Sequence, residues 1–536
     1  MNEKFEMVAK TFQGLEEVLA EELRLLGAEN VEPGRRMVSF EGDKAMLYKA
    51  NLCCRTALRI LKPIYKFIAG NTDELYEMVK EFDWGKIISI DKTFAIDTVA
   101  YSDEFSHSRF VTYRVKDAIV DWFRDRYDDK RPGVRLQDAD VLINVHIAGD
   151  RVTLSLDSSG ESLHKRGYRV SQTEAPINEV LAAGIIMLSG WRGDCPLVDP
   201  MCGSGTFVIE GALIAANIMP GVFRKNFAFE NWPDFDEELF ESIYNDDSNE
   251  REVTCKICGA DISPKAVDIA LRNAKSAGVA KYIDLEVKPL SRWEDAPADG
   301  VMITNPPYGE RISVDDMEGL YQMLGQKLKH VFQGYHAWII GYKDEYFQKI
   351  HLAASVRKPL LNGSLECELR EYVIFEGDMR SFRNEGGRIK HGGDEVDDER
   401  RQAKDRRRPG DREWMKSARE KGFGGKDGRR RERPGDRDDR NEKPYRQSDR
   451  RRRSFDDRDE RSYRQERGDR RDSRERYPST AGRRFERQDD GHDDNPLKDR
   501  RNAAALRQIT GKQPSLPAME GPMMRLRRGW KKREEK

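Results

Sequence analysis

Two short runs far apart in the chain carry the residue types best suited to chemistry. The first, DPMCGSGT, spans Asp199 to Thr206, and the second, TNPPYGER, spans Thr304 to Arg311. The small residues and carboxylate of the first run suit a cradle for a nucleotide-like cofactor. The rigid, polar second run suits a clamp for a planar amine. In this order, the two runs predict methyl transfer from S-adenosylmethionine to the exocyclic nitrogen of a base.

The first run predicts a strand end, a glycine-rich turn and then a helix. Ligands of a doubly wound sheet bind outside the carboxyl ends of its strands, and Asp199 would lie at such an end. Glycine lets a ligand approach the backbone, and amides at the start of the next helix can face the methionyl carboxylate. Asp261 would end the following strand and accept the ribose hydroxyls. The expected cofactor contacts are Asp199, Pro200, Gly203, Gly205, Thr206, Asp261 and Asn305.

The glycines alone fit two interpretations. Their spacing is GxG rather than GxGxxG, which disfavours a pyrophosphate-binding dinucleotide site. A plain glycine-rich turn remains the alternative to a cofactor cradle.

The second run is expected to hold the reacting base. Consecutive prolines fix the backbone and keep nearby carbonyls free of helical hydrogen bonds. The Asn305 side chain and the Pro306 carbonyl could accept both amine hydrogens and aim the nitrogen lone pair at the methyl group. Tyr308 could stack on an extruded base. The expected catalytic residues are therefore Asn305, Pro306, Pro307 and Tyr308, and the alternative is a rigid turn with a core tyrosine.

The elements that must position these runs alternate between strand and helix. A helix over 177–188, a strand over 196–199, a helix over 207–216 and a strand over 254–260 come first. Further segments follow in the same alternation, which predicts a doubly wound parallel α/β sheet. They are a helix over 264–277 and strands near 283–287, 300–304, 337–341 and 371–375.

The first 157 residues predict a mixed α+β region without a catalytic cluster. Helical spacing over Leu15–Leu26 ends at Gly27, and a second amphipathic helix is expected over Val115–Phe123. Alternating apolar residues predict strands over 37–41 and around Phe94 and Ile96. Two more strands are expected over 141–147 and 152–157.

The cysteines favour neither disulfides nor a metal centre. Seven cysteines at irregular positions are typical of a reducing, cytoplasmic compartment. The pair Cys255 and Cys258 lacks the second pair that a structural zinc site needs, and no metal is expected. The residues around this pair, Val253–Ile257, are expected to form a buried strand leading to Asp261. No apolar run is long enough to span a membrane.

Charge divides the chain into an acidic body and a basic tail. Residues 381–536 carry 49 Lys and Arg and 34 Asp and Glu, a net charge of +15. The first 380 residues carry 46 and 62, a net charge of −16. The tail lacks apolar periodicity and is expected to be disordered. Its Arg-rich tracts could add weak, salt-dependent RNA contacts, and the alternative is a solvating spacer.

Several motifs in a fixed order resemble the THUMP-domain family of class I S-adenosylmethionine-dependent RNA methyltransferases. The resemblance is strongest to the bacterial enzymes that form N2-methylguanosine in 23S ribosomal RNA, and it covers the chain to about residue 380. Besides the two runs above, the motifs are GLEEVLAEEL, VKDAIVDWF, SLHKRGYR from Ser162 to Arg169 and APINEVLAAG from Ala175 to Gly184.

The resemblance implies an RNA-capturing region followed by a catalytic Rossmann-like domain. A ferredoxin-like segment would span residues 1–43, a THUMP domain 44–157, the methyltransferase domain 158–380 and the tail 381–536. This chain departs from the family pattern at one position. Related enzymes often have an acidic residue after the third strand, which binds the adenine amine. This chain has Val287–Leu290 there, so Asp295 or backbone groups near Leu290 could substitute.

Exposed basic loops are candidates for RNA phosphate contacts. The alternative for each residue is an ordinary solvated charge. These candidates are Ser106, His107, Arg109, His164, Lys165, Arg166 and Arg169.

Three functions are compatible with the sequence. The first is an N2-guanine methyltransferase acting on 23S ribosomal RNA or a large-subunit precursor. The second is the same chemistry on a tRNA guanine or on an adenine. The third is a non-catalytic RNA-binding assembly factor, which the intact Asp199, Gly203, Asn305 and Tyr308 disfavour.

Overall fold

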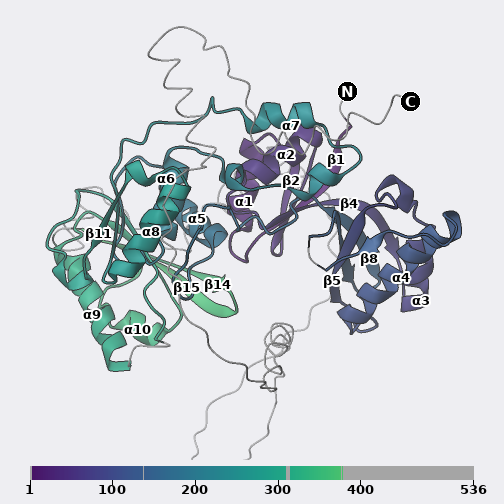
Figure 1. The fold of residues 1–536 in the computed structure, drawn as a ribbon. Coiled ribbons are helices and arrows are strands. Elements are labelled where there is room, and N and C mark those ends of the chain that lie inside the picture. Colours follow the sequence, from purple (N-terminus) through teal and green to yellow (C-terminus); the bar gives the residue numbers. More distant parts are fainter. Residues whose placement is uncertain (1–2, 137, 310–313, 376, 378–536) are drawn as a thin grey trace, which may run out of the picture. The chain divides into compact units, whose positions relative to one another are not determined.

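The computed structural model describes residues 3–136, 138–309, 314–375 and 377. Two β-sheets with helices packed on them account for this part of the chain (Figure 1). Glu310 and Arg311 of the second run, and the tail from residue 381, lie outside the described residues, so the predictions made for them stay predictions. Among the described helices, none has the length and apolar character needed to cross a bilayer.

The first sheet has eight strands within the described residues, in the order β2-β3-β1-β4-β8-β7-β5-β6. Its strands are β1 (Phe5–Lys10), β2 (Glu29–Gly34), β3 (Met37–Gly42), β4 (Arg59–Ile68), β5 (Thr93–Tyr101), β6 (Gly133–Val134), β7 (Val141–Ala148) and β8 (Arg151–Asp157). The N-terminal part of β4 pairs with β1, and its whole length from Leu61 pairs with β8. One long strand therefore joins the N-terminal strands to the following α+β region.

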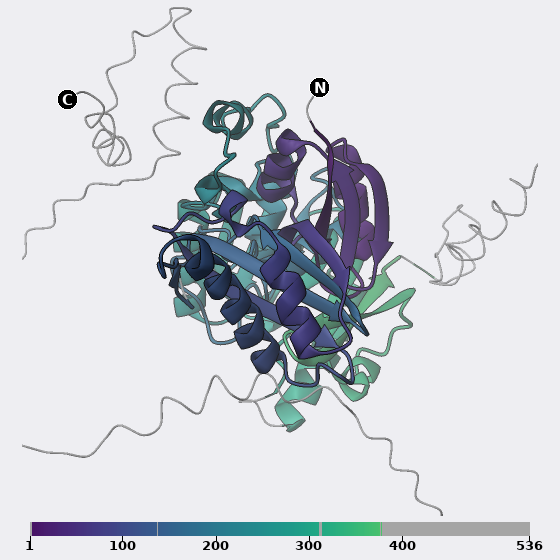
Figure 2. The ribbon, with the colours of Figure 1, turned by 90° about the vertical axis from the view of Figure 1, so that its right-hand side faces the viewer.

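Four helices accompany this sheet, and α3 and α4 pack on the same core as β5 and β7 (Figure 2). They are α1 (Glu16–Leu25), α2 (Lys44–Cys53), α3 (Thr72–Glu81) and α4 (Ser108–Arg126). The expected helix over 15–26 is confirmed, and Gly27 follows it with φ +93°. Helix α4 begins earlier than expected because Val111, one turn before Val115, is also buried and extends the apolar face.

The second sheet has seven strands in the described part of the chain, in the order β11-β10-β9-β12-β13-β15-β14. Pairing is parallel from β11 to β13 and antiparallel on both sides of β15. The strands are β9 (Leu197–Asp199), β10 (Ile257–Asp261), β11 (Ile283–Val287), β12 (Val301–Thr304), β13 (His336–Gly341), β14 (Val356–Asn362) and β15 (Leu365–Val373). The predicted doubly wound sheet is confirmed, and the chain reverses its winding direction between β9 and β12.

Helices cover this second sheet and contribute many of its buried core residues. They are α5 (Glu179–Leu188), α6 (Thr206–Ala215), α8 (Pro264–Ser276), α9 (Val314–His330) and α10 (Asp344–Gln348). Helices α5 and α6 are buried along nearly their whole length, which explains their almost unbroken apolar sequences.

The prediction of a strand over Val253–Ile257 is wrong. Strand β10 begins only at Ile257, and the residues before it are half-buried or exposed. Its neighbour β9 is short because Pro196 has no amide hydrogen to donate to a longer ladder. Residue Cys255 therefore lies before the sheet rather than inside it.

The segment between α6 and β10 packs an aromatic cluster onto the N-terminal core. It contains α7 (Glu237–Tyr244) and two short 3₁₀ turns. The Phe229 ring lies 4.6 Å from the ring of Tyr48 in α2, and Phe240 lies 5.6 Å from it. Gly221 fits against the Leu52 backbone, where a Cβ would come within 2.8 Å. Tertiary packing thus joins this insertion to elements far earlier in the sequence.

Candidate active site

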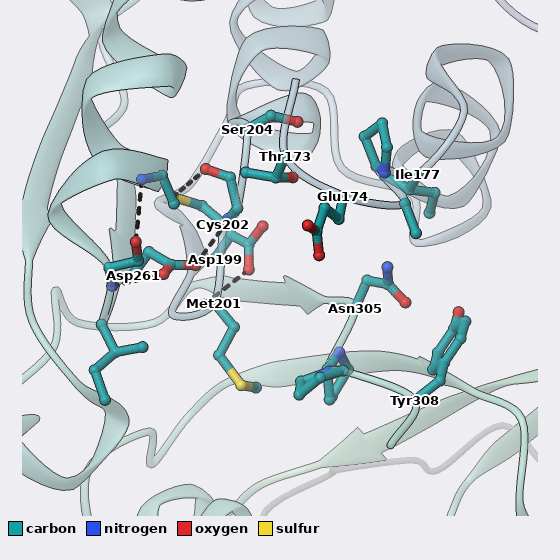
Figure 3. A pocket seen from close by; sticks show the side chains of 18 of the residues that line it. Thr173, Glu174, Ile177, Asp199, Met201, Cys202, Ser204, Asp261, Asn305 and Tyr308 are labelled. Carbon is teal, nitrogen blue, oxygen red and sulfur yellow. Dashed lines mark hydrogen bonds between the residues drawn. The ribbon is translucent and has the colours of Figure 1, made fainter. Parts of the chain in front are cut away.

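A cavity of about 940 Å³ lies at the carboxyl ends of β9, β10 and β12. Asp199 and Asp261 end their strands there, and Asn305 follows β12. Figure 3 shows the two carboxylates on one side of this cavity and Asn305 and Tyr308 on the other, with Glu174 between them. The two runs that the sequence singled out therefore meet at one edge of one sheet, at its topological switch point.

Asp199 is buried at this edge, with only 2% of its surface exposed. The Thr304 hydroxyl donates to its Oδ1 at 2.8 Å, and the Met201 amide donates to the same oxygen at 3.2 Å. Burial raises the pKa of Asp199 to about 7, against the effect of these hydrogen bonds, and the charge of Asp261 raises it further. A positively charged ligand group beside it would favour its ionised form.

Asp261 fixes the glycine-rich loop through the backbone. Its Oδ2 accepts the Gly203 amide at 3.0 Å, and its Oδ1 accepts the Ser263 amide at 2.8 Å. Each carboxylate oxygen has a second lone pair, so ligand hydroxyls could still bind. The carboxylate thus links the end of β10 to the turn after β9.

The two glycines of the loop have different surroundings. Gly203 has φ +54°, and the atom nearest to a Cβ built there would be Thr173 Oγ1 at 3.7 Å, an ordinary contact, so no neighbour crowds that side of the backbone. Gly205 has φ +82°, and its Cβ would lie 2.9 Å from Ala270 Cβ in α8. Gly203 lines the cavity and Gly205 does not. The missing side chain of Gly205 lets α8 pack closely, and the cofactor contact expected for Gly205 stays a prediction.

The second run presents an unpaired polar atom to the cavity. Asn305 Oδ1 is buried, and it has no hydrogen-bond partner among the described residues. A buried acceptor left in this state costs free energy unless a donor reaches it, about 1–3 kcal/mol. Because Asn305 lines the cavity, a ligand N–H is the donor that this position suits.

Tyr308 is held at its hydroxyl end by the β14–β15 hairpin. Asn362 Nδ2 donates to the Tyr308 hydroxyl oxygen at 3.1 Å, and Cys367 Sγ lies 3.7 Å from it. Burial raises the Tyr308 pKa well above its usual range, so the phenol stays neutral. The ring is fixed in the cavity wall, where it can serve as a stacking surface.

Most of the expected site residues share this one cavity. Those that line it are Asp199, Pro200, Gly203, Thr206, Asp261, Asn305, Pro306, Pro307 and Tyr308. Asp295, one of the two candidates for the adenine amine, lines a different cavity. Leu290 and Ser291 lie in the wall of the main cavity instead.

Sequence reasoning missed several segments of the cavity wall, among them parts of α8 and α9 and two loops. The first loop is residues 172–177, which include Thr173 and Glu174 and precede α5. The second is the hairpin turn at Asn362–Gly363, with Leu365 beside it. An Asn-Gly pair between apolar runs is a recognised hairpin signal, so the turn could have been predicted. Its place beside Tyr308 could not.

The basic candidates divide into exposed and internal residues. Ser106, His107 and Arg109 are exposed at the start of α4, and Lys165 is exposed after β8. His164 is half-buried, with its Nδ1 2.8 Å from the Ser162 hydroxyl.

For two arginines in this group, the structure corrects the prediction of RNA phosphate contacts. Arg166 is 2% exposed and donates to the backbone oxygens of Leu163 and Arg55, with Glu210 Oε1 3.5 Å from its Nε. Arg169 donates to Glu179, Ser204 and Thr206 inside the protein. Their guanidinium groups bind internal acceptors, so the prediction of phosphate contacts is wrong for both.

The seven cysteines are free thiols, and burial raises the pKa of both Cys255 and Cys258. The described residues contain no group of three or more His, Cys, Asp or Glu side chains placed to hold a metal ion.

Three family matches cover most of the described chain. Residues 6–61 match the RlmL ferredoxin-like domain, residues 69–157 match the THUMP domain, and residues 166–371 match the RMKL-like methyltransferase domain. They follow one another along the chain, and the last of them contains the whole cavity edge of the second sheet.

Two relatives and one solved structure extend the similarity to most of the chain's length. The putative RNA methyltransferase slr0064 of Synechocystis is 39% identical over 370 residues, 68% of this chain and 96% of that protein. The ribosomal RNA large subunit methyltransferase K/L of Syntrophotalea carbinolica is 39% identical over 391 residues. That match covers 70% of this chain and 54% of the relative, so the chain spans about half of its length. The crystal structure of SMU.472, a putative methyltransferase complexed with SAH, has a TM-score of 0.63 and 33% identity, covering 70% of this chain and all of that one.

Proposed function

The chain belongs to the THUMP-domain family of class I S-adenosylmethionine-dependent RNA methyltransferases, and from this premise we propose that it methylates the N2 amine of a guanine in 23S ribosomal RNA. The observation that carries the proposal is the buried Asn305 Oδ1, which has no hydrogen-bond partner within the described part of the chain and lies in the same cavity as Asp199 and Asp261. It supplies an acceptor at the point where a substrate amine would enter.

An acceptor at this position favours an exocyclic amine over a ring nitrogen. An amine has hydrogens to donate, whereas guanine N7 has none and would meet the Asn305 oxygen lone pair to lone pair. With Asn305 Oδ1 holding one hydrogen and the Pro306 carbonyl the other, the nitrogen lone pair is oriented and its developing positive charge is stabilised. Tyr308, fixed by Asn362, supports the ring of the flipped base by stacking.

The other side of the cavity fits the cofactor. S-adenosylmethionine, when bound, supplies an electrophilic methyl group on a sulfonium centre. The uncrowded backbone at Gly203 would admit its methionyl part, Asp199 would bind its positively charged groups, and Asp261 would accept its ribose hydroxyls. No general base is required before methylation, because the attacking lone pair is already present on the neutral amine, and the methylated nitrogen then releases its extra proton to water.

The choice of RNA rests on the family and on the N-terminal region. The THUMP match and the exposed Ser106, His107 and Arg109 support capture of a structured RNA by residues 69–157. The name of the Syntrophotalea relative supports the large-subunit ribosomal RNA as substrate. We also propose that the boundaries between the ferredoxin-like segment, the THUMP domain, the methyltransferase domain and the tail fall at residues 43, 157 and 380.

The decisive test is mapping of modified nucleosides in ribosomal RNA from cells with and without this protein, by mass spectrometry. We expect one N2-methylguanosine in 23S RNA to disappear and to return when the purified enzyme and S-adenosylmethionine are added. Loss of an N6-methyladenosine, or of a tRNA modification alone, would contradict the proposed substrate.

Asn305→Ala tests the amine clamp directly. We expect it to lower kcat by at least about 100-fold, because one preorganised acceptor is lost, while S-adenosylmethionine still binds. Asn245→Ala, at an exposed position after α7, is the matched control and should retain wild-type activity. An Asn305→Ala enzyme as active as the wild type would exclude the clamp.

A further inference from the structure

Arg169 lies outside the cavity wall and donates hydrogen bonds to two side chains of the glycine-rich loop. Its Nη1 donates to the Ser204 hydroxyl at 2.8 Å, its Nη2 donates to the Thr206 hydroxyl at 2.9 Å, and its Nε donates to Glu179 Oε1 at 2.6 Å. The Arg169 side chain is 15% exposed, and Arg169 is not part of the cavity wall. Its contacts reach the loop rather than the ligand space.

A second side chain binds the same loop residue at its backbone carbonyl. Asn273 in α8 is fully buried, and its Nδ2 donates to the Ser204 carbonyl at 3.1 Å and to the Ser171 carbonyl at 2.9 Å. Its Oδ1 accepts the amides of Val170 and Ser171. The residues just after Arg169 are thereby tied to Ser204, so this segment and the loop form one hydrogen-bonded unit.

The loop needs such support because of its backbone. Gly203 and Gly205 both have positive φ, and glycine is the residue with the most backbone freedom to lose. A planar guanidinium with donors in a fixed fork can span three acceptors at once, which a lysine ammonium cannot do in the same geometry. Glu179, at the first turn of α5, balances the arginine charge.

We propose that Arg169 is a positioning residue, which holds the glycine-rich loop in its cofactor-binding conformation through the hydroxyl groups of Ser204 and Thr206. This inference rests on the proposed function, because it assigns the loop to S-adenosylmethionine. It also replaces the role in RNA binding that the basic SLHKRGYR motif suggested.

The test compares S-adenosylmethionine and RNA binding in the full-length protein. Arg169→Met should raise the Kd and the KM for S-adenosylmethionine about tenfold or more, since it removes hydrogen bonds from a charged donor. The kcat at saturating cofactor should change less, and the Kd for ribosomal RNA should not change. Arg169→Lys should recover only part of the cofactor affinity. Arg192→Met, at an exposed arginine after α5, is the matched control and should bind both ligands normally.

A second variant removes the acceptors and keeps the arginine. Ser204→Ala with Thr206→Val leaves the Arg169–Glu179 ion pair in place, and unchanged cofactor affinity in this variant overturns the inference even where Arg169→Met does not fold. Because Ser204 and Thr206 also line the cavity, the combination with Arg169→Met separates lost support of the loop from lost contact with the ligand. It should weaken cofactor binding by a similar factor, and adding Arg169→Met should weaken it little further, since contacts that act together are not additive.

Three results would overturn the inference: unchanged cofactor affinity in the acceptor variant, additive losses in the combined variant, or a loss confined to RNA binding in Arg169→Met. Failure of the proposed function is distinguishable from these results, because the wild-type protein itself would then bind no S-adenosylmethionine or form no N2-methylguanosine.

Discussion

The Thr304 hydroxyl, at the end of β12, donates a 2.8 Å hydrogen bond to Asp199 at the end of neighbouring β9. Both residues are almost completely buried, and they belong to the two runs that carry the chemistry. Asn305 directly follows Thr304 in the chain. The hydrogen bond therefore joins the cofactor side and the amine side of the cavity at the switch point of the sheet.

Thr304→Val should make cofactor binding more sensitive to acid. Without the hydroxyl donor, the pKa of Asp199 rises further above about 7, and less carboxylate is present at neutral pH. The Kd for S-adenosylmethionine should therefore begin to rise at a pH about one unit higher than in the wild type. Calorimetric titrations across a pH series would measure this, with Thr304→Ser as the control that keeps the donor. Superimposable pH profiles would contradict it.

Asp199→Asn should stabilise the cofactor-free protein at alkaline pH. Folding raises the pKa of Asp199 from 3.8 to about 7. Its contribution to stability is therefore fully present below pH 3.8 and is lost as the pH rises through about 7, by about 4 kcal/mol in total. Asparagine carries no charge to bury, so the variant should melt above the wild type by clearly more near about pH 8 than near about pH 5, where only about 1.6 kcal/mol of the total has been lost. Thermal midpoints at both pH values measure the difference, and an equal difference at both would refute the assignment.

Tyr308→Phe and Tyr308→Ala should separate the hydroxyl from the ring. Phenylalanine loses only the contacts to Asn362 and Cys367, so activity should fall a few-fold. Alanine also removes the stacking surface, which is worth about 1–3 kcal/mol per base, so the KM for RNA should rise by at least about fivefold. Steady-state kinetics on the RNA substrate would test this order. Equal kinetics in the two variants would argue against stacking.

Phe229→Ala should destabilise the protein, although Phe229 does not line the active-site cavity. The Phe229 ring is 1% exposed and packs on Tyr48 in α2, and deleting such a ring usually costs about 3–5 kcal/mol. Phe229→Leu, which keeps most of the volume, should cost much less. Denaturant unfolding gives both values, and cofactor affinity below the transition should stay at the wild-type level. A small loss in Phe229→Ala would show that the insertion contributes little to the core.

Local sequence was sufficient to predict the doubly wound sheet and the placement of Asp199, Gly203, Asp261 and Asn305. A strand end followed by a glycine turn or a proline pair is specified by neighbouring residues, and the carboxyl ends of parallel strands meet at one edge of a sheet. The same local signals misled at Val253–Ile257, because strand length also depends on the partner strand, and β9 cannot extend past Pro196.

The sequence by itself determined which residue types stand at the strand ends, and hence the chemistry available there. Only the tertiary structure decided which way each side chain faces. Arg166 and Arg169 look like RNA contacts in the sequence, yet they bind acceptors inside the fold. Gly205 faces α8, and Asn362 reaches Tyr308 from 54 residues away. Local periodicity specifies an element and its faces, but contacts between distant residues arise only when the elements pack, so no local pattern encodes them.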